Sequence, residues 1–87
     1  MRVLIVDDER SIRNSLKEIL CDEGYSVETA EDGIVALSLV EKEKFDVIFC
    51  DIKMPGMDGS EVLEKITSMG IDAAVVMISG HGDIDTA

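Results

Sequence analysis

The sequence predicts an α/β fold in which a doubly wound parallel sheet carries helices on both faces. Apolar runs of strand length at residues 3–6, 47–50 and 73–78 alternate with amphipathic stretches of helix length. Strands that are buried on both faces read as continuous apolar runs, and right-handed helical crossovers join them. The order of elements is βαβαβαβ, and the predicted strand order is 2-1-3-4.

The first half of the chain contains two predicted strands with a helix between them. Residues 9–24 have the spacing of an amphipathic helix, and Gly24 is well placed to end it. The residues expected on its buried face are Ile12, Leu16, Ile19 and Leu20. Residues 25–30 (YSVETA) alternate and contain β-branched side chains, which predicts a short second strand.

The second half repeats this pattern twice. Residues 31–33 (EDG) predict a turn before a helix, and residues 46–51 (DVIFCD) predict the third strand. The apolar residues of that second helix are Ile34, Leu37 and Val40. A third helix ends at Gly70, before a fourth strand that is expected to be buried. Its predicted apolar face consists of Val62, Leu63, Ile66 and Met69.

Composition limits the classes of function. The 87 residues carry 19 acids against 8 bases, a net charge of -11, which disfavours contact with DNA phosphates or anionic lipid. The apolar runs are too short to span a membrane and no signal-peptide pattern is found, so a cytoplasmic location is expected. Cys21 and Cys50 are far apart in sequence, and both are expected to be buried, reduced thiols.

Acidic residues follow two of the predicted strands. Asp7 and Asp8 come after the first strand, and Asp51 ends the third. In the strand order 2-1-3-4 these strands are neighbours at the switch point, where open α/β sheets build their ligand sites. Three converging carboxylates repel one another unless some are protonated or a hard cation lies among them, and oxygen ligands suit Mg²⁺. One carboxylate could then act as a nucleophile toward phosphorus.

Several of the polar residues near the predicted strand ends also have a simpler structural interpretation. Asp7 and Asp8 could form a solvated loop, with Asp8 or Ser11 as the N-cap of the first helix. Ser79, after the fourth strand, could donate its hydroxyl to a phosphoryl oxygen or be an ordinary turn residue. Asp58 is expected to be a loop or helix-capping residue, and His81 an exposed loop residue.

The segments VDDE, FCDIKMPGMDG and VMISGHGD resemble the receiver domain of two-component response regulators over essentially the whole chain. The resemblance implies a flavodoxin-like fold with Asp51 as the phosphoacceptor. It also implies Asp8 as a direct Mg²⁺ ligand, Asp7 as a ligand through water, and the backbone carbonyl of Lys53 as a further ligand, beside Asp51 itself. Ser79 would be the switch hydroxyl.

Members of this family continue through a fourth helix, a fifth strand and a fifth helix, whereas this sequence stops at Ala87. Residues 1–87 therefore resemble a partial receiver domain, without the fifth strand, the last two helices, the pocket lysine and the aromatic switch residue. The fourth strand would then be an open edge, so that either the sequence is a fragment or another copy completes it, as a homodimer or an element-swapped oligomer. SGHGD further resembles regulators that drive an AAA+ ATPase with an alternative sigma factor.

The resemblance implies a phosphorylatable switch rather than an enzyme. A sensor histidine kinase would supply the phosphoryl group, and an output domain, through which transcription is regulated, would read it. One alternative is a Mg²⁺-dependent phosphohydrolase with the same aspartyl chemistry, although Asp51-Ile52-Lys53 lacks the DxD of the haloacid dehalogenase type. Another is an inert receiver-like interaction module.

Overall fold

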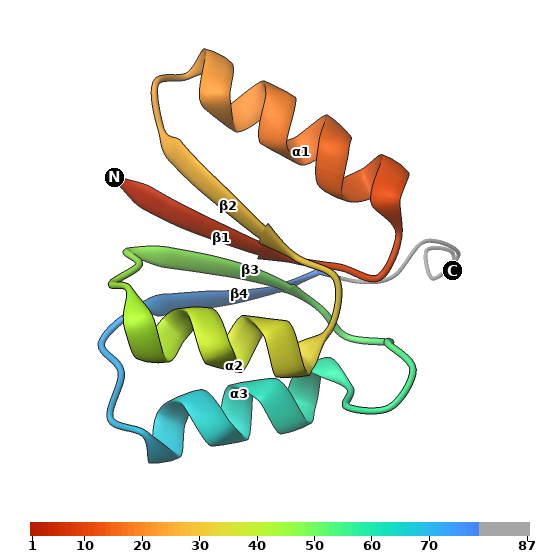
Figure 1. The fold of residues 1–87 in the computed structure, drawn as a ribbon, viewed down its shortest axis with the longest axis vertical. Helices are drawn as coiled ribbons and strands as arrows, with labels where there is room; N and C mark the ends of the chain where they lie inside the picture. Colours follow the sequence, from red (N-terminus) through yellow and green to blue (C-terminus); the bar gives the residue numbers. More distant parts are fainter. Residues whose placement is uncertain (79–87) are drawn as a thin grey trace.

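The computed structural model describes residues 1–78, and seven helices and strands lie within them. The strands are β1 (Arg2–Val6), β2 (Ser26–Ala30), β3 (Val47–Asp51) and β4 (Ala74–Ile78). The helices are α1 (Arg10–Asp22), α2 (Gly33–Lys42) and α3 (Gly59–Ser68). These elements alternate along the chain as predicted (Figure 1).

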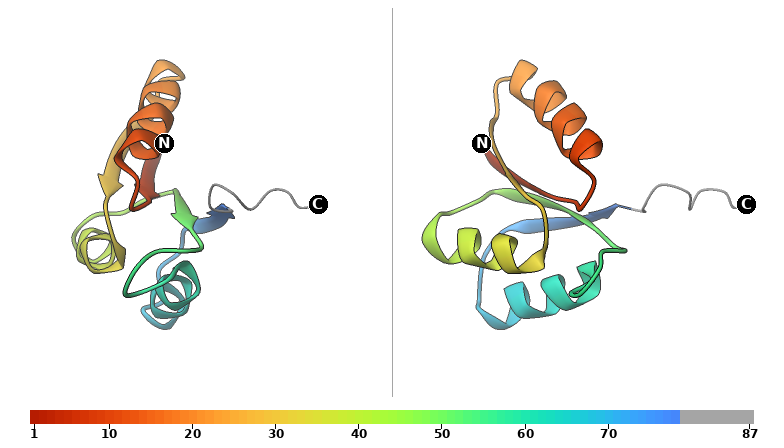
Figure 2. Two further views of the ribbon diagram at one scale, coloured as in Figure 1. Left: turned by 90° about the vertical axis from the view of Figure 1, so that its right-hand side faces the viewer. Right: turned by 45° about the vertical axis from the view of Figure 1, so that its right-hand side comes forward.

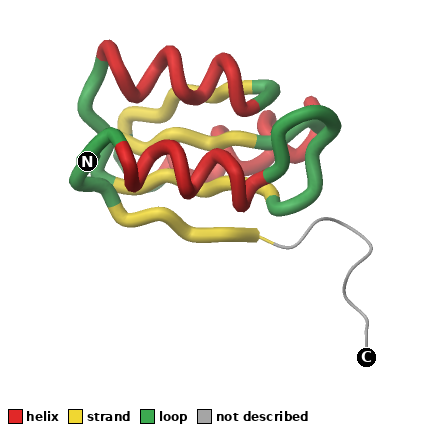
Figure 3. Tube along the Cα trace, turned by 90° about the horizontal axis from the view of Figure 1, so that it is seen from below, coloured by secondary structure: helices red, strands yellow, loops and turns green. Residues whose placement is uncertain are grey.

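The four strands form one parallel sheet in the order β2-β1-β3-β4, which confirms the predicted order. β1 is central, with Val6 level with Ala30 of β2 and with Cys50 of β3. Because all strands run in the same direction, their carboxyl ends meet at one edge, on the right in Figure 1. β4 lies at the side of the sheet, beside β3 (Figure 3).

Helices cover both faces of the sheet, with α1 on one face and α2 and α3 on the other (Figures 1 and 2). The α2/α3 face holds the larger apolar cluster, in which Val62 and Ile66 of α3 pack with inward residues of β1 and β3. The α1 face is smaller, with Val3, Ile5 and Val27 against Leu16 and Leu20. Because side chains alternate between the two faces along each strand, the sheet has a separate apolar core on each face.

Several predicted burials are wrong, and most of them concern the α1 face, which is only partly covered. α1 contacts β1 and β2, while Val76 on β4 stays 40% exposed, so β4 is not the buried strand that its apolar run predicts. Ile19 is 59% exposed, although it was expected on the buried face of its helix. Met69 lies beyond the last residue of α3 and is also exposed, and the Cys21 thiol is exposed rather than buried.

The helix ends follow the predicted glycines but only one of the predicted caps. Gly24 and Gly70 have φ of 94° and 72° directly after the C-caps of α1 and α3, a conformation that glycine adopts without a steric penalty. Asp58 caps α3 through a capping box with Glu61. The N-cap of α1 is Glu9, without a side-chain capping bond, so the alternative in which Asp8 or Ser11 caps this helix is wrong.

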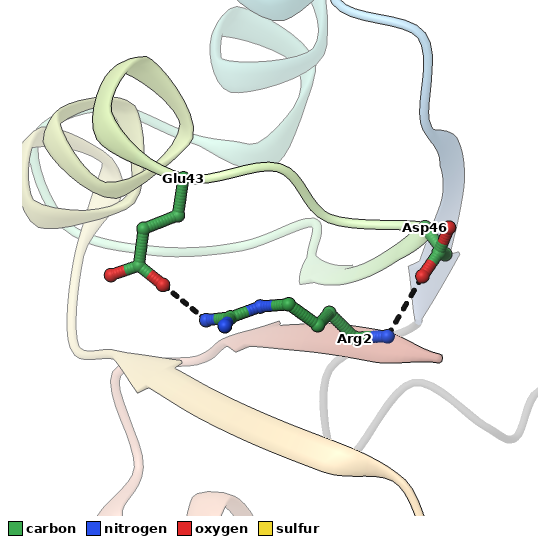
Figure 4. Close-up of polar contacts among 3 residues, drawn as sticks. All are labelled: Arg2, Glu43 and Asp46. Atoms are coloured by element: carbon green, nitrogen blue, oxygen red, sulfur yellow. Dashed lines mark hydrogen bonds and ion pairs between the residues drawn. The ribbon is translucent and has the colours of Figure 1, made fainter.

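Polar contacts hold the start of β1 at the opposite edge of the sheet (Figure 4). The Arg2 backbone N–H donates to Asp46 Oδ2 at 2.8 Å, and its guanidinium pairs with Glu43. The same guanidinium lies 5.2 Å from the centre of the Phe45 ring, within cation–π range. These contacts hold the start of β1 against the segment that precedes β3, at the edge of the sheet opposite the carboxyl ends of the strands.

Candidate metal centre

Three carboxylates meet at the carboxyl edge of the sheet. Val6 and Cys50 are partners in the β1–β3 pairing, so the next residues, Asp7 and Asp51, emerge side by side. One carboxylate oxygen from each of Asp7, Asp8 and Asp51 lies within 4.8 Å of the others. The predicted convergence of these acids is confirmed, whereas the alternative of a solvated capping loop does not describe Asp7.

The burial of these acids differs in a way that suits a hydrated cation. Asp7 is 3% exposed and Asp51 1% exposed, whereas Asp8 is exposed to solvent. Two desolvated negative charges at this separation repel strongly, and a divalent cation would offset that repulsion. The donor atoms are all carboxylate oxygens, without the His or Cys that zinc prefers, and the open side at Asp8 leaves room for water ligands. The residues present therefore fit Mg²⁺.

Asp7 is held in place through both its backbone and its side chain. Its N–H donates to the Ala30 carbonyl of β2 at 3.1 Å, one residue beyond the end of β1. Its Oδ1 accepts the Glu9 N–H at 2.9 Å, and its carbonyl accepts from Arg13 Nη1 at 2.7 Å. The sequence reasoning did not identify Arg13, because an arginine in an amphipathic helix reads as part of its solvated face.

Asp51 is positioned by the close approach of α3. The Gly59 N–H donates to the Ile52 carbonyl at 2.9 Å, and the helix starts directly against the end of β3. A Cβ at Gly59 would lie only 2.3 Å from the Asp51 carbonyl oxygen and 2.7 Å from Met77 Cε. Only glycine fits at position 59 without such close contacts. Asp58 and Gly59, at the start of α3, therefore combine a helix cap with this close approach.

The acids also affect the neighbouring thiol. Burial, followed by the negative charges of Asp51 and Asp7, raises the pKa of Cys50 from 9.0 to about 11. Cys50 points to the opposite face of the sheet from Asp51, into the α2/α3 core. It is therefore a neutral, buried thiol at physiological pH, as expected from the sequence.

The loop after β3 contains Lys53, whose backbone carbonyl is a predicted metal ligand. Lys53 is exposed, two residues past Asp51, and lines an open cavity of about 560 Å³ with Ile52, Met54, Pro55 and Asp58. The role of the Lys53 carbonyl as a metal ligand stays a prediction. Ser79 and His81 lie outside the described residues, and their predicted roles stay predictions as well.

The fold and this acidic edge are those of a CheY-like receiver. The profile of the response regulator receiver domain family matches residues 3–87, and the chain belongs to this family. The response regulator MprA of Mycobacterium avium is 38% identical over 84 residues, which cover 97% of this chain and 37% of that protein. The chain therefore spans little more than a third of the length of this curated relative.

Solved structures agree with the family assignment. The response regulator TrrA of Thermotoga maritima, determined in complex with Mg²⁺-BeF, is 41% identical with a TM-score of 0.86, covering 93% of this chain and 70% of its own. The chemotaxis protein CheY4 of Vibrio cholerae is 41% identical with a TM-score of 0.85, covering 87% of this chain and 65% of its own. The chain is thus similar over most of its length to receivers that are longer than it is.

The part of the chain that the structure describes contains no helix long and apolar enough to cross a membrane.

Proposed function

We propose that this receiver domain accepts a phosphoryl group from a sensor histidine kinase on Asp51, in a reaction that depends on Mg²⁺. The observation that carries the proposal is the placement of Asp51, which is 1% exposed, with a carboxylate oxygen within 4.8 Å of those of Asp7 and Asp8. A buried carboxylate beside two others lowers the stability of the fold, and such arrangements of ionisable groups are typical of functional sites. Phosphoryl acceptor chemistry would account for this one.

The transfer step follows from the carboxylate chemistry. An Asp51 oxygen attacks the phosphorus of a phosphohistidine, a P–O bond forms to the aspartate, and the P–N bond breaks with its electron pair going to the imidazole nitrogen. Asp7 and Asp8 would hold Mg²⁺ together with Asp51. When bound, the ion supplies positive charge that neutralises the phosphoryl oxygens.

The output of the switch would come from a partner or domain that responds to the receiver. Phosphorylation adds negative charge at the acidic edge and would bias an existing equilibrium between two conformations. An output domain would read that change, and transcription regulation in the cytoplasm is the output implied by the family. In this function the chain is a phosphoacceptor rather than a catalyst with turnover.

Intact-mass spectrometry after incubation with Mg²⁺ and acetyl phosphate tests the proposal. We expect the wild-type chain to gain one phosphoryl group, and Asp51→Asn or wild type in EDTA to gain none. Labelling retained in Asp51→Asn would refute the assignment of the acceptor. Turnover of a small phosphomonoester would point to a phosphohydrolase instead, and a folded, Mg²⁺-bound wild type without any label would point to an inert receiver-like module.

A further inference from the structure

Arg13 closes a ring of hydrogen bonds at the start of α1. The Glu9 N–H donates to Asp7 Oδ1 at 2.9 Å, and the Arg13 N–H donates to the Glu9 carbonyl at 3.1 Å. The Arg13 guanidinium then returns to the Asp7 carbonyl at 2.7 Å through Nη1. The ring therefore joins the end of β1, the N-cap of α1 and the first turn of α1.

This ring restrains a helix start that has no side-chain cap. Glu9, the N-cap of α1, makes no side-chain capping hydrogen bond. Asp7 lies one residue beyond β1, and its carbonyl accepts the Arg13 donor. A charged donor at 2.7 Å makes a stronger bond than a neutral one. Because Asp8 lies within the ring, its backbone is restrained at both neighbours.

We propose that Arg13 is a positioning residue that orients Asp7 and Asp8 for binding a divalent cation, acting through the Asp7 carbonyl and not through contact with the ion. The proposal rests on the metal site proposed above. Residues that support metal ligands commonly change metal affinity by about 10–100-fold when they are removed, because the ligands must otherwise be ordered as the ion binds.

The sign of the effect separates positioning from simple electrostatics. The positive charge of Arg13 opposes the approach of a cation, so removing that charge alone would strengthen Mg²⁺ binding. Loss of positioning would weaken it. Arg10 provides a matched control, because it is an exposed arginine on the same helical turn and its removal changes the net charge by the same amount.

Calorimetric titration of the metal-free chain with Mg²⁺ tests the proposal directly. We compare wild type, Arg13→Met, Arg13→Lys and Arg10→Met, each at a temperature where circular dichroism shows it folded. We expect Arg13→Met to raise the Kd by about tenfold, Arg13→Lys to restore part of the affinity, and Arg10→Met to bind as tightly as wild type or more tightly. Arg13→Met binding as tightly as wild type would overturn the proposal.

Amide hydrogen exchange gives a second readout that needs no metal. In the metal-free chain, loss of the Arg13 bond should speed exchange at the Glu9 amide, which donates to Asp7, without changing amides near Asp22 at the far end of α1. Unchanged exchange at Glu9 in both Arg13→Met and Arg13→Lys would also overturn the proposal. Absence of Mg²⁺ binding by the wild type would instead refute the metal site, and the role of Arg13 with it.

Discussion

Replacing Asp51 with asparagine should stabilise the metal-free protein while it abolishes phosphorylation. The substitution keeps the shape of the side chain and removes one of three carboxylates whose oxygens lie within 4.8 Å of one another. Asp7 and Asp51 are both buried, so water screens their repulsion poorly. The native site is therefore expected to cost stability whenever no cation is bound.

The size of this effect follows from the separation of the charges. At 4.8 Å, two unit charges repel by about 3–4 kcal/mol at an effective dielectric constant of about 20, which suits the Asp7–Asp51 pair. Asp8 is exposed, and its repulsion with Asp51 is nearer to about 1 kcal/mol. A buried asparagine N–H that lacks an acceptor costs about 1–3 kcal/mol. The net gain should be about 1–4 kcal/mol, a rise in Tm of at least about 4 °C.

Thermal unfolding followed by circular dichroism in EDTA measures the gain. Asp72→Asn is the matched control, since Asp72 is exposed in the loop before β4, at the opposite edge of the sheet, and should change Tm little. Adding Mg²⁺ at a hundredfold excess over Kd should stabilise wild type by about 2.7 kcal/mol and Asp51→Asn much less. Asp51→Asn that is less stable than wild type in EDTA, or that gains equally from Mg²⁺, would refute the electrostatic reasoning.

Three further predictions concern the core and α3. The raised pKa of Cys50 means that its ionisation favours unfolding, so stability should fall between about pH 9 and pH 11, by about 1.4 kcal/mol at pH 10. Urea unfolding of Cys50→Ala should lack this part of the pH dependence. Asp58→Ala removes the capping box and should cost about 1 kcal/mol in the same assay, with exposed Glu64→Ala as its control. Gly59→Ala places a methyl group 2.3 Å from the Asp51 carbonyl oxygen and should cost about 1–3 kcal/mol, whereas Ser60→Ala should not.

The strands and the site could be predicted because their signals are local. Four short apolar or alternating runs fix the strands to within a residue or two, and the acids that follow two of them meet once the strand order is known. The capping role of Asp58, one of two alternatives the sequence left open, likewise depends on residues nearby in the chain. Such features depend on residues close together in sequence and on the rule that an open α/β sheet places its ligand site where the strand order reverses.

The failures concern residues whose surroundings come from distant segments. Helical spacing places Ile19 on an apolar face, but whether that face is covered depends on how much of the sheet α1 spans. Cys21 was expected to be buried because free cysteines usually are, and it is exposed. Arg13 was missed because its acceptor is a backbone carbonyl beyond the end of β1, and helical spacing alone does not point to such a partner. A search for arginines one turn into a helix that follows an acidic strand end would have found it.

The central position of β1 has a consequence for synthesis on the ribosome. β1 pairs with β2 on one side and with β3 on the other, and β3 is the later of the two in the chain. At about 5–20 residues per second, the segment between the end of β1 and Asp51 takes about two to nine seconds to make. During that interval the apolar residues of β1 lack one of their two neighbouring strands. Because Asp51 is the last residue of β3, the strand that ends this exposure also delivers the third acid of the site.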